Sequence, residues 1–495
     1  MLDRPRRERT RSTSDRRPEN SCMEWIREIG LIALCAHSIG VLTAVNAIMK
    51  TRTSQGAIAW AITLFMFPYV AVPAYWIFGR NRFHGYVEAR RSENRGVQHI
   101  TNTLRGAAGE FIVTDDMPYE LKTFQILAEF PFSRKNSIRL LINGEATFDA
   151  IFAAIATAEK YVLVQFYILR DDDLGRALQQ QLIDRAQAGV HVSVLYDEIG
   201  SYGLSRKYVA ELREAGVLIV PFHTTKGRGN RFQLNFRNHR KIVVVDGQTA
   251  YVGGHNVGDE YMGRDPKIGP WRDTHVELRG PAVQAVQRSF LEDWNWATHE
   301  LPPVEWIPQP SDDDQQVLVV PTGPADDIER CTLFFVQAIN MAQKRIWIAS
   351  PYFVPDPPVI AALQLAAIRG CDVRIILPER PDHILVYLSA FSFIAEAAPS
   401  GVRFFRYEPG FLHQKVVLID DHFAAVGTAN LDNRSFHLNF EIMIAAADHK
   451  FAAEVAHMLE EDFQQCREAH ADELAQQSYA FRLTVALSRL MAPIQ

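Results

Sequence analysis

The chain has 495 residues, of which 47% are hydrophobic and 22% are charged. This composition is typical of globular proteins and excludes a disordered or collagen-like chain, and the length predicts about three structural units of roughly 150 residues. The 52 Lys and Arg residues against 58 Asp and Glu residues give a net charge of −6, so no overall basic field favours nucleic acid as a partner.

The N-terminal region predicts a membrane anchor. Residues 1–27 are expected to form a disordered basic tail. Two stretches without Asp, Glu, Lys or Arg follow, over 29–49 and 57–78, and each is about 32 Å long as a helix, which matches a hydrocarbon core of ~30 Å. Residues 28–79 are therefore predicted to form two transmembrane helices. Two prolines in the second stretch leave a kinked span or a re-entrant hairpin open, and a pair of buried core helices is the alternative outside the membrane.

The distribution of Lys and Arg predicts the orientation of this anchor. Residues 1–20 contain seven arginines and residues 80–95 contain five, whereas the short connection between the two apolar stretches contains only Lys50 and Arg52. Because positive residues remain on the cytoplasmic side, the protein is expected in the cell (inner) membrane as a multi-pass protein with its catalytic part in the cytoplasm.

The remaining chain repeats one pattern of helices and strands. Helical stretches alternate with short apolar runs, which predicts α/β architecture: two pseudo-symmetric lobes with mostly parallel or mixed sheets. The predicted strands are 161–167, 190–196, 345–349 and 371–377. The expected divisions are a juxtamembrane connection over 80–130, a first lobe over 131–298, a linker over 299–316, a second lobe over 317–475 and an amphipathic tail over 476–495. The tail is expected either on the membrane surface or docked on the core.

The repeat is clearest in a motif of the form H-x-K-x4-D, which occurs twice. Each copy continues through a glycine to an asparagine seventeen residues past the histidine. A single H-x-K would mean little, but two copies inside strand–turn–strand patterns are unlikely to be accidental. The candidate residues are His239, Lys241, Asp246 and Asn256 in the first copy, and His413, Lys415, Asp420 and Asn430 in the second.

The spacing of the motif explains how it would build a site. Residues i and i+2 of a strand share a face, so each His and Lys point the same way. If the two lobes pack symmetrically, two imidazoles, two ammonium groups and two amides surround one pocket, which suits a phosphodiester. Asp246 and Asp420 act either in catalysis or only in organising the turn that follows each strand.

The chemistry predicted for such a pocket is covalent. Because an imidazole has an ordinary pKa of ~6.5, one ring is expected to be neutral and the other protonated near pH 7. The neutral ring attacks phosphorus to form a phosphohistidine, and the protonated ring protonates the departing alcohol. No metal or other cofactor is required. The five dispersed cysteines indicate reduced thiols rather than disulfides or a zinc site.

The paired motifs and the sequence segments around them resemble those of the phospholipase D superfamily, and within it those of the bacterial cardiolipin synthases. The resemblance covers nearly the whole chain beyond residue 20. The words that carry it are NHRKIVVVDG, GGHNVGDEY, WRDTHVELRGPAV, SPYFVPD, FLHQK and GTANLDNRSF. It implies a bilobed α/β fold, catalytic roles for both H-x-K-x4-D motifs and phosphate-binding roles for Asn256 and Asn430. It also implies that Asp273 and Glu441 are carboxylates that orient the catalytic rings.

The activity implied by the resemblance is transfer of a phosphatidyl group from one phosphatidylglycerol to another, giving cardiolipin and glycerol. The expected partners are phosphatidylglycerol and the bilayer, with no nucleic acid. The alternatives are a hydrolytic phospholipase D, a transferase that uses phosphatidylethanolamine as donor and, outside enzymes, a membrane scaffold. His239 is favoured as nucleophile and His413 as general acid by analogy only, and the oligomeric state is open.

Overall fold

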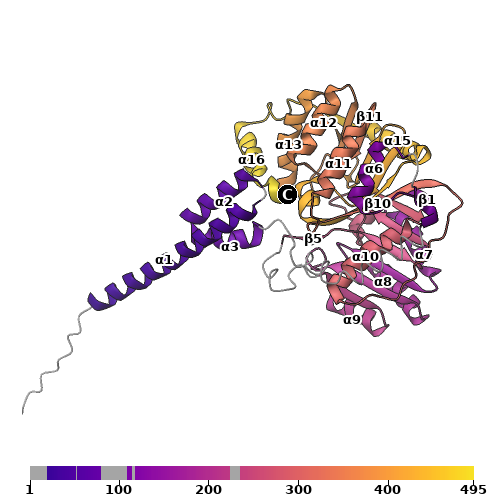
Figure 1. Cartoon of the computed structure of the whole chain (residues 1–495), viewed down its shortest axis with the longest axis horizontal. Coiled ribbons are helices and arrows are strands. Elements are labelled where there is room, and N and C mark those ends of the chain that lie inside the picture. The colour runs from indigo at the N-terminus through magenta and orange to yellow at the C-terminus, as the bar shows by residue number, and fades with distance from the viewer. Residues whose placement is uncertain (1–18, 52, 80–108, 114–116, 223–234) are drawn as a thin grey trace, which may run out of the picture. The chain divides into compact units, whose positions relative to one another are not determined.

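The computed structural model describes residues 19–51, 53–79, 109–113, 117–222 and 235–495 (Figure 1). The chain separates into two compact units, one over 1–80 and one over 81–495.

The N-terminal unit consists of three helices: α1 (Glu19–Lys50), α2 (Ser54–Met66) and α3 (Pro68–Phe78). Only the segment Trp25–Lys50 of α1, 26 residues, is long and apolar enough to cross a membrane among the described residues. The helix begins at Glu19, so the prediction of a disordered tail is wrong for 19–27, and residues 1–18 lie outside the described part of the chain.

The second apolar stretch is broken into two helices and does not form one continuous span. The break falls at Phe67, directly before Pro68, because a proline lacks the N–H of a helical ladder and restricts the residue before it. Helices of 13 and 11 residues are only about 20 and 17 Å long, which is short of a hydrocarbon core of ~30 Å. The predicted second transmembrane helix is thus not seen as a single element.

The three helices nevertheless contact one another closely. The Tyr75 hydroxyl donates to Asn46 Oδ1 at 3.0 Å. A Cβ atom on Gly40 would lie 2.5 Å from the Leu64 carbonyl oxygen, so only glycine permits this approach of α1 and α2.

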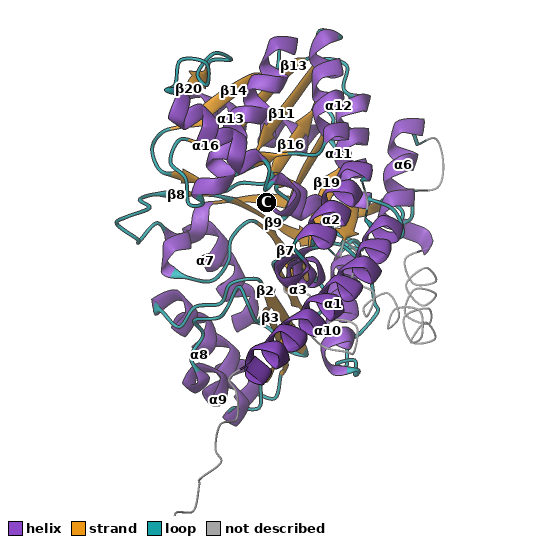
Figure 2. Cartoon of the chain, turned by 90° about the vertical axis from the view of Figure 1, so that its left-hand side faces the viewer, coloured by secondary structure: helices purple, strands orange, loops and turns teal. Residues whose placement is uncertain are grey.

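The larger unit is built on one continuous sheet with a pseudo-twofold arrangement (Figures 1 and 2). The two halves join where β1 pairs antiparallel with β10, and the strand order away from this joint is the same on both sides. On one side it runs β1 (Ser133–Ile142), β9 (Thr274–Arg279), β7 (Thr249–Gly253), β6 (Ile242–Val245), β2 (Tyr161–Phe166), β3 (His191–Asp197) and β4 (Leu218–Phe222). On the other it runs β10 (Gln315–Thr322), β19 (Asn439–Ala446), β17 (Phe423–Gly427), β16 (Val416–Ile419), β11 (Arg345–Ala349), β13 (Asp372–Pro378), β14 (Arg403–Tyr407) and β20 (Cys466–Ala469).

The sheet is mixed, which is one of the two arrangements expected from the sequence, and a mostly parallel sheet is not formed. Within each half only β2, β3 and β4, or β11, β13 and β14, run parallel. The strands that follow the two H-x-K motifs turn back in tight hairpins, and hairpins give antiparallel pairs. The fold is therefore the expected duplicated α/β fold. It has more antiparallel strand pairs than the alternation of helices and strands in the sequence predicted.

Helices cover both faces of this sheet (Figure 2). Helices and their hydrophobic clusters cover one face of each half, and a central core lies under α10 and α15. The helices are α6 (Tyr119–Ala128), α7 (Asn143–Ala156), α8 (Asp173–Gln187), α9 (Arg206–Glu214), α10 (Val283–Thr298), α11 (Arg330–Met341), α12 (Pro357–Ile368), α13 (Ile384–Ala397), α14 (Asn433–His437), α15 (His449–Gln464) and α16 (Tyr479–Arg489).

The C-terminal helix α16 docks on α13. Val485 is buried at this contact, and the Ser488 hydroxyl donates to the Leu385 carbonyl at 2.7 Å. The opposite face of α16 exposes Leu483 and Leu487. The tail is therefore docked on the core, as one of the two sequence alternatives proposed, while it keeps an exposed apolar face.

Candidate active site

The two H-x-K motifs lie at the beginnings of β6 and β16, and each is bonded to the other half of the sheet. The two-residue strand β5 (Arg237–Asn238) pairs with β19, and the His239 N–H donates to the Phe440 carbonyl at 2.9 Å. In the other half β15 (Phe411–Leu412) pairs with β8 (Trp271–Arg272), and the His413 N–H donates to the Arg272 carbonyl at 2.8 Å. These exchanged strands bring the two motifs to the junction of the lobes.

Each catalytic candidate histidine takes its carboxylate partner from the other lobe. His239 Nδ1 lies 3.0 Å from both carboxylate oxygens of Glu441, and His413 Nδ1 lies 2.8 Å from Asp273 Oδ2. All four side chains are buried. A carboxylate at Nδ1 places the proton there and leaves the Nε2 lone pair of a neutral ring available.

Glu441 is held by three further side-chain donors. The hydroxyls of Thr428 and Ser435 donate to its two oxygens at 2.6 and 2.8 Å, and the Asn439 amide lies 3.2 Å away. The sequence analysis did not single out these three residues. The segment GTANLDNRSF could have indicated two of them, because Thr428 precedes the motif asparagine and Ser435 follows it.

Asp273 is held differently. Its Oδ2 accepts the Trp271 indole N–H at 3.3 Å, and its Oδ1 accepts the N–H of Thr274 at 2.8 Å. A Cβ atom on Gly254 would lie 1.9 Å from Asp273 Oδ1, so the second glycine of the GGHN word is required for the carboxylate to fit. The equivalent position in the other lobe is Thr428.

Both motif lysines are buried beside the histidines. The Lys241 ammonium donates to the His239 carbonyl at 2.6 Å, and the Lys415 ammonium donates to the His413 carbonyl. Burial lowers the pKa of Lys241 well below its usual value and lowers the pKa of Lys415 to about 8. Two lysines in one buried site favour an anionic ligand, because a bound anion would raise the pKa of both side chains and keep them protonated.

Burial also decides the charge of the two rings. It lowers the pKa of His239 to about 4, against the opposing effect of Glu441. Burial and then the ammonium groups of Lys415 and Lys241 lower the pKa of His413 well below its usual value, and the charge of His239 acts in the same direction. Burial therefore favours the neutral form of both rings in the absence of substrate, whereas the sequence predicted one neutral and one protonated ring.

The two motif asparagines have different surroundings. Asn256 Oδ1 accepts the N–H of Ile168 at 3.0 Å, and its amide group donates to the Tyr261 hydroxyl at 3.1 Å. The amide group of Asn430 donates to Asp432 at 3.2 Å. Both side chains are buried, as a group that contacts substrate inside a closed site would be.

The motif aspartates bond the backbone and do not contact the imidazoles. Asp246 accepts the N–H groups of residues 159–161 at 2.8 Å, and Asp420 accepts those of residues 343–345 at 2.7 to 2.9 Å. Both have a positive φ, near 51°, in the hairpin turn at the opposite end of β6 and β16 from the histidine. These contacts favour the turn-organising alternative over a direct catalytic role.

A second buried histidine pair lies beside the first and was missed from the sequence. His255 Nδ1 lies 3.2 Å from His275 Nδ1, and burial lowers the pKa of both rings to about 3. They flank Asn256 and Asp273 in the sequence, where their neutral rings fill the core behind the site.

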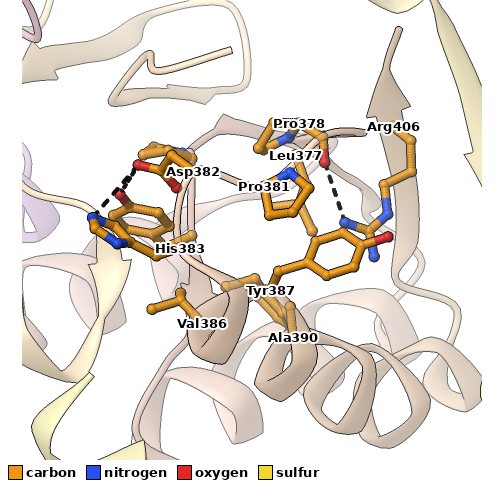
Figure 3. A pocket seen from close by; sticks show the side chains of 12 residues that line it. Leu377, Pro378, Pro381, Asp382, His383, Val386, Tyr387, Ala390 and Arg406 are labelled. Carbon is orange, nitrogen blue, oxygen red and sulfur yellow. Dashed lines mark hydrogen bonds and ion pairs between the residues drawn. The ribbon is translucent and has the colours of Figure 1, made fainter. Parts of the chain in front are cut away.

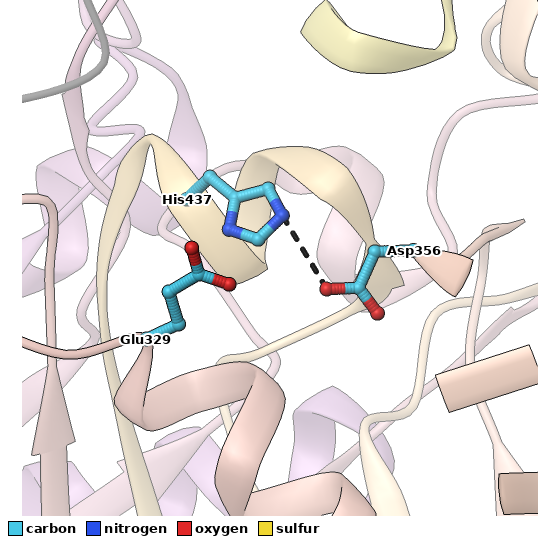
Figure 4. Close-up of side chains that lie close together, drawn as sticks. All are labelled: Glu329, Asp356 and His437. Atoms are coloured by element: carbon cyan, nitrogen blue, oxygen red, sulfur yellow. Dashed lines mark ion pairs between the residues drawn. The ribbon is translucent and has the colours of Figure 1, made fainter. Parts of the chain in front are cut away.

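One group of potential metal-binding side chains exists among the described residues, and it lies outside the paired motifs. The ligand atoms of Glu329, Asp356 and His437 lie within 4.8 Å of one another (Figure 4). Asp356 already accepts the Thr332 hydroxyl at 2.8 Å and caps α12, and His437 lies 3.4 Å from it as an ion pair. These contacts account for the cluster as part of the lobe's structure.

Comparisons with known proteins agree on one family. A family model described as "Cardiolipin synthase, PLD-like domain" matches residues 151–294 and 335–466, one segment in each half of the sheet. A second, described as "Phospholipase_D-nuclease N-terminal", matches residues 39–80.

Full-length relatives show the same similarity. Cardiolipin synthase A of Pseudomonas fluorescens is 50% identical over 94% of this chain and 98% of its own length, and that of Pseudomonas aeruginosa strain LESB58 is 50% identical over 94% and 96%. Among solved structures, phosphatidylserine synthase of Haemophilus influenzae aligns with a TM-score of 0.59 at 17% identity, covering 76% of this chain and all of its own. This last likeness concerns the fold alone.

Proposed function

The chain belongs to the cardiolipin synthase family of phospholipase D-like proteins, and we propose that it joins two phosphatidylglycerol molecules into cardiolipin and releases glycerol. It is a phosphatidyltransferase that acts on phospholipids. The observation that carries the proposal is the crossed arrangement of two buried His–carboxylate pairs with two buried lysines, which supplies one nucleophile, one proton carrier and an anion site.

In the first half-reaction His239 Nε2 attacks the phosphorus of the donor lipid. The new P–N bond replaces the P–O bond to the glycerol headgroup, and the departing oxygen takes a proton from His413. The phosphate brings a negative charge next to the buried His413, which favours the protonated ring. Lys241, Lys415 and the two asparagines hold the non-bridging oxygens.

The second half-reaction reverses these roles. The primary hydroxyl of a second phosphatidylglycerol attacks the phosphohistidine, His413 takes the hydroxyl proton, and the P–N bond breaks to restore His239. One P–O bond is formed for each one broken, so the overall transfer is nearly thermoneutral. The enzyme must therefore favour a lipid hydroxyl over water, and a buried site gives that preference.

The membrane arrangement is part of the proposal. Segment Trp25–Lys50 supplies at least one membrane-capable helix. We assign α2 and α3 to the same membrane anchor, with the two lobes, 131–298 and 317–475, on the cytoplasmic side. The support is the arginine-rich composition of residues 1–20 and 80–95. The basic segments themselves lie largely outside the described residues.

Product analysis tests this function directly. The purified full-length protein is incubated with phosphatidylglycerol vesicles, and lipids and glycerol are quantified. Cardiolipin with an equal amount of glycerol supports the proposal, phosphatidic acid with glycerol supports a hydrolase, and no turnover supports a scaffold. Adding phosphatidylethanolamine to the vesicles tests the alternative donor, because ethanolamine would then be released.

A further inference from the structure

A small pocket in the second lobe lies beside the site and has no role in the steps above. It is formed between the ends of β13 and β14 and the first turns of α13 (Figure 3). Asp382 and His383 lie at one end and Tyr387 and Arg406 at the other, with the apolar side chain of Pro381 between them.

One end of this pocket lies beside the second motif, because Phe353 of its lining pairs with Leu431, the residue directly after Asn430. The charge of Asp382 acts on the Lys415 ammonium, and the charge of His383 acts on the His413 ring. Asp382 also accepts the Tyr352 hydroxyl at 2.5 Å. A molecule in the pocket would therefore extend from the neighbourhood of Asn430 toward Arg406.

At the other end, Arg406 is a buried cation that forms no ion pair within the described part of the chain. Its side chain is 2% exposed, and its guanidinium lies over the rings of Tyr387 and Phe391 at 5.4 and 5.2 Å. Nη1 donates to the Pro378 carbonyl at 3.3 Å, whereas Nη2 has no hydrogen-bond acceptor among the described residues.

Two acidic side chains, Glu379 and Glu473, act on this charge without bonding to it. The carboxylates of Glu379 and Glu473 bind the guanidinium of Arg467 instead, at 2.9 and 2.7 Å. A buried charge without a counterion is costly, and an anion that enters the pocket would offset that cost. A guanidinium is also the side chain best shaped to hold a phosphate.

The first lobe has no equivalent of this arginine. Arg406 lies opposite Leu377 in the β13–β14 pair, and the corresponding pair in the first lobe places Pro221 opposite Tyr196. At this strand position the duplicated fold therefore has a cation in the second lobe and none in the first. A reaction between two lipids needs such a difference, because donor and acceptor occupy the site in different ways.

We propose that this pocket binds the phosphodiester of the acceptor lipid, with Arg406 as the residue that holds its charge. The inference rests on the proposed transfer reaction. An acceptor phosphatidylglycerol carries its own phosphate three carbons from the reacting hydroxyl, so an anion site beside the second motif would position that hydroxyl. A water molecule gains nothing from this pocket, so the pocket favours transfer over hydrolysis.

Two reactions of the same enzyme separate the acceptor site from the phosphoryl centre. Cardiolipin formation needs an acceptor with a phosphate, whereas exchange of labelled glycerol into phosphatidylglycerol uses a neutral acceptor and the same two histidines. We expect Arg406→Gln to lower cardiolipin formation about tenfold or more, since a hydrogen bond to a charged group is lost, and to leave glycerol exchange within about twofold of the unaltered protein.

The matched control is Arg403→Gln on the same strand. Arg403 is paired with Glu468 on the surface, away from the pocket lining, and its replacement is expected to leave both reactions unchanged. Equal loss of both reactions in a folded Arg406→Gln protein overturns the inference. If the unaltered protein exchanges glycerol but makes no cardiolipin, that result contradicts the proposed function itself, independently of the role of Arg406.

A measurement on the unaltered protein covers the case in which Arg406→Gln does not fold. Glycerol 1-phosphate, a soluble mimic of the acceptor headgroup, is added to both assays. Stronger inhibition of cardiolipin formation than of glycerol exchange supports a separate acceptor site. Equal inhibition of both places the anion at the shared phosphoryl centre and contradicts the inference.

Discussion

The two halves of the site are built on the same plan but are not chemically equal. His239 is paired with Glu441, which three neighbouring side chains hold, whereas His413 is paired with the shorter Asp273, which rests against Gly254 and accepts an indole N–H. The backbone repeats, and the side chains that hold the carboxylate beside each ring do not. A two-step transfer needs one nucleophile and one proton carrier, and this difference in surroundings is how a duplicated fold can provide both.

Removing either ring is the strongest test of that comparison. His239→Ala and His413→Ala should each lower cardiolipin formation by a factor on the order of 10³ or more, because each ring takes part in bond breaking. The assay is product formation in phosphatidylglycerol vesicles, with membrane insertion and melting temperature as controls. Substantial activity in either variant would contradict the paired mechanism.

A substrate with a better leaving group separates the two rings. A phosphatidyl ester of p-nitrophenol needs no proton on its departing oxygen, so His413→Ala should still release a burst of nitrophenol while His239→Ala should not. The reverse result would exchange the two roles and place the nucleophile on the Asp273 side.

The carboxylates are expected to have the next largest effect. Glu441→Gln and Asp273→Asn keep the shape of each site but remove the charge that orients the ring, and each should lower kcat about 10- to 100-fold. The buried Glu277, which forms ion pairs with Arg139 and Arg279 on the far part of β9, provides a control as Glu277→Gln. Equal losses in all three variants would indicate a general effect on folding.

The pH profile tests the electrostatic side of the comparison. Burial lowers the pKa of His239 to about 4, so the free enzyme keeps a neutral nucleophile as pH falls until that range is reached, and kcat/KM should decline only there. The pKa of His413, the proton donor, is lowered well below its usual value by burial and by the ammonium groups of Lys415 and Lys241, so kcat/KM should fall as pH rises through that range. Burial lowers the pKa of Lys415 to about 8, so a further decline is expected above that pH as the ammonium loses its charge. Glu441 raises the pKa of His239, and Glu441→Gln should therefore move the acidic limb to still lower pH.

The two lobes also show what could be predicted from the sequence. The His, Lys and Asn positions follow from the repeated motif, because a period of two on a strand and one turn define them locally. The exchange of carboxylates between lobes does not, since β5 and β15 pair with partners more than a hundred residues away. The lowered pKa of both rings could not be predicted for the same reason, since burial depends on packing that no local pattern encodes.

The break in the second apolar stretch also could not be predicted from a local pattern. Its hydropathy predicted a single span, and Pro68 and Pro73 only left alternatives open. The actual geometry depends on how α2 and α3 pack against α1 through Gly40 and Asn46.

The motif aspartates should affect stability more than catalysis. Asp246→Ala and Asp420→Ala each remove a carboxylate that accepts three backbone N–H groups, which should cost about 1–3 kcal/mol for every such group left unsatisfied. We expect a lower melting temperature for each variant and nearly unchanged activity per folded molecule at low temperature. A large loss of kcat in a protein with normal stability would instead restore the catalytic assignment of these aspartates.

Removing metal ions should have the smallest effect of all. The paired histidines and lysines supply both the nucleophile and the positive charge for phosphate, so cardiolipin formation should be unchanged after treatment with EDTA. The Glu329, Asp356 and His437 cluster gives this experiment a second use, because a metal there would stabilise the second lobe through its ligands. An unchanged melting temperature with EDTA is expected, since Asp356 already caps α12 and bonds Thr332. A lower melting temperature with full activity would reveal a structural ion in that cluster. A loss of activity alone would mean that the reaction between the lobes requires a metal ion in addition to the two histidines.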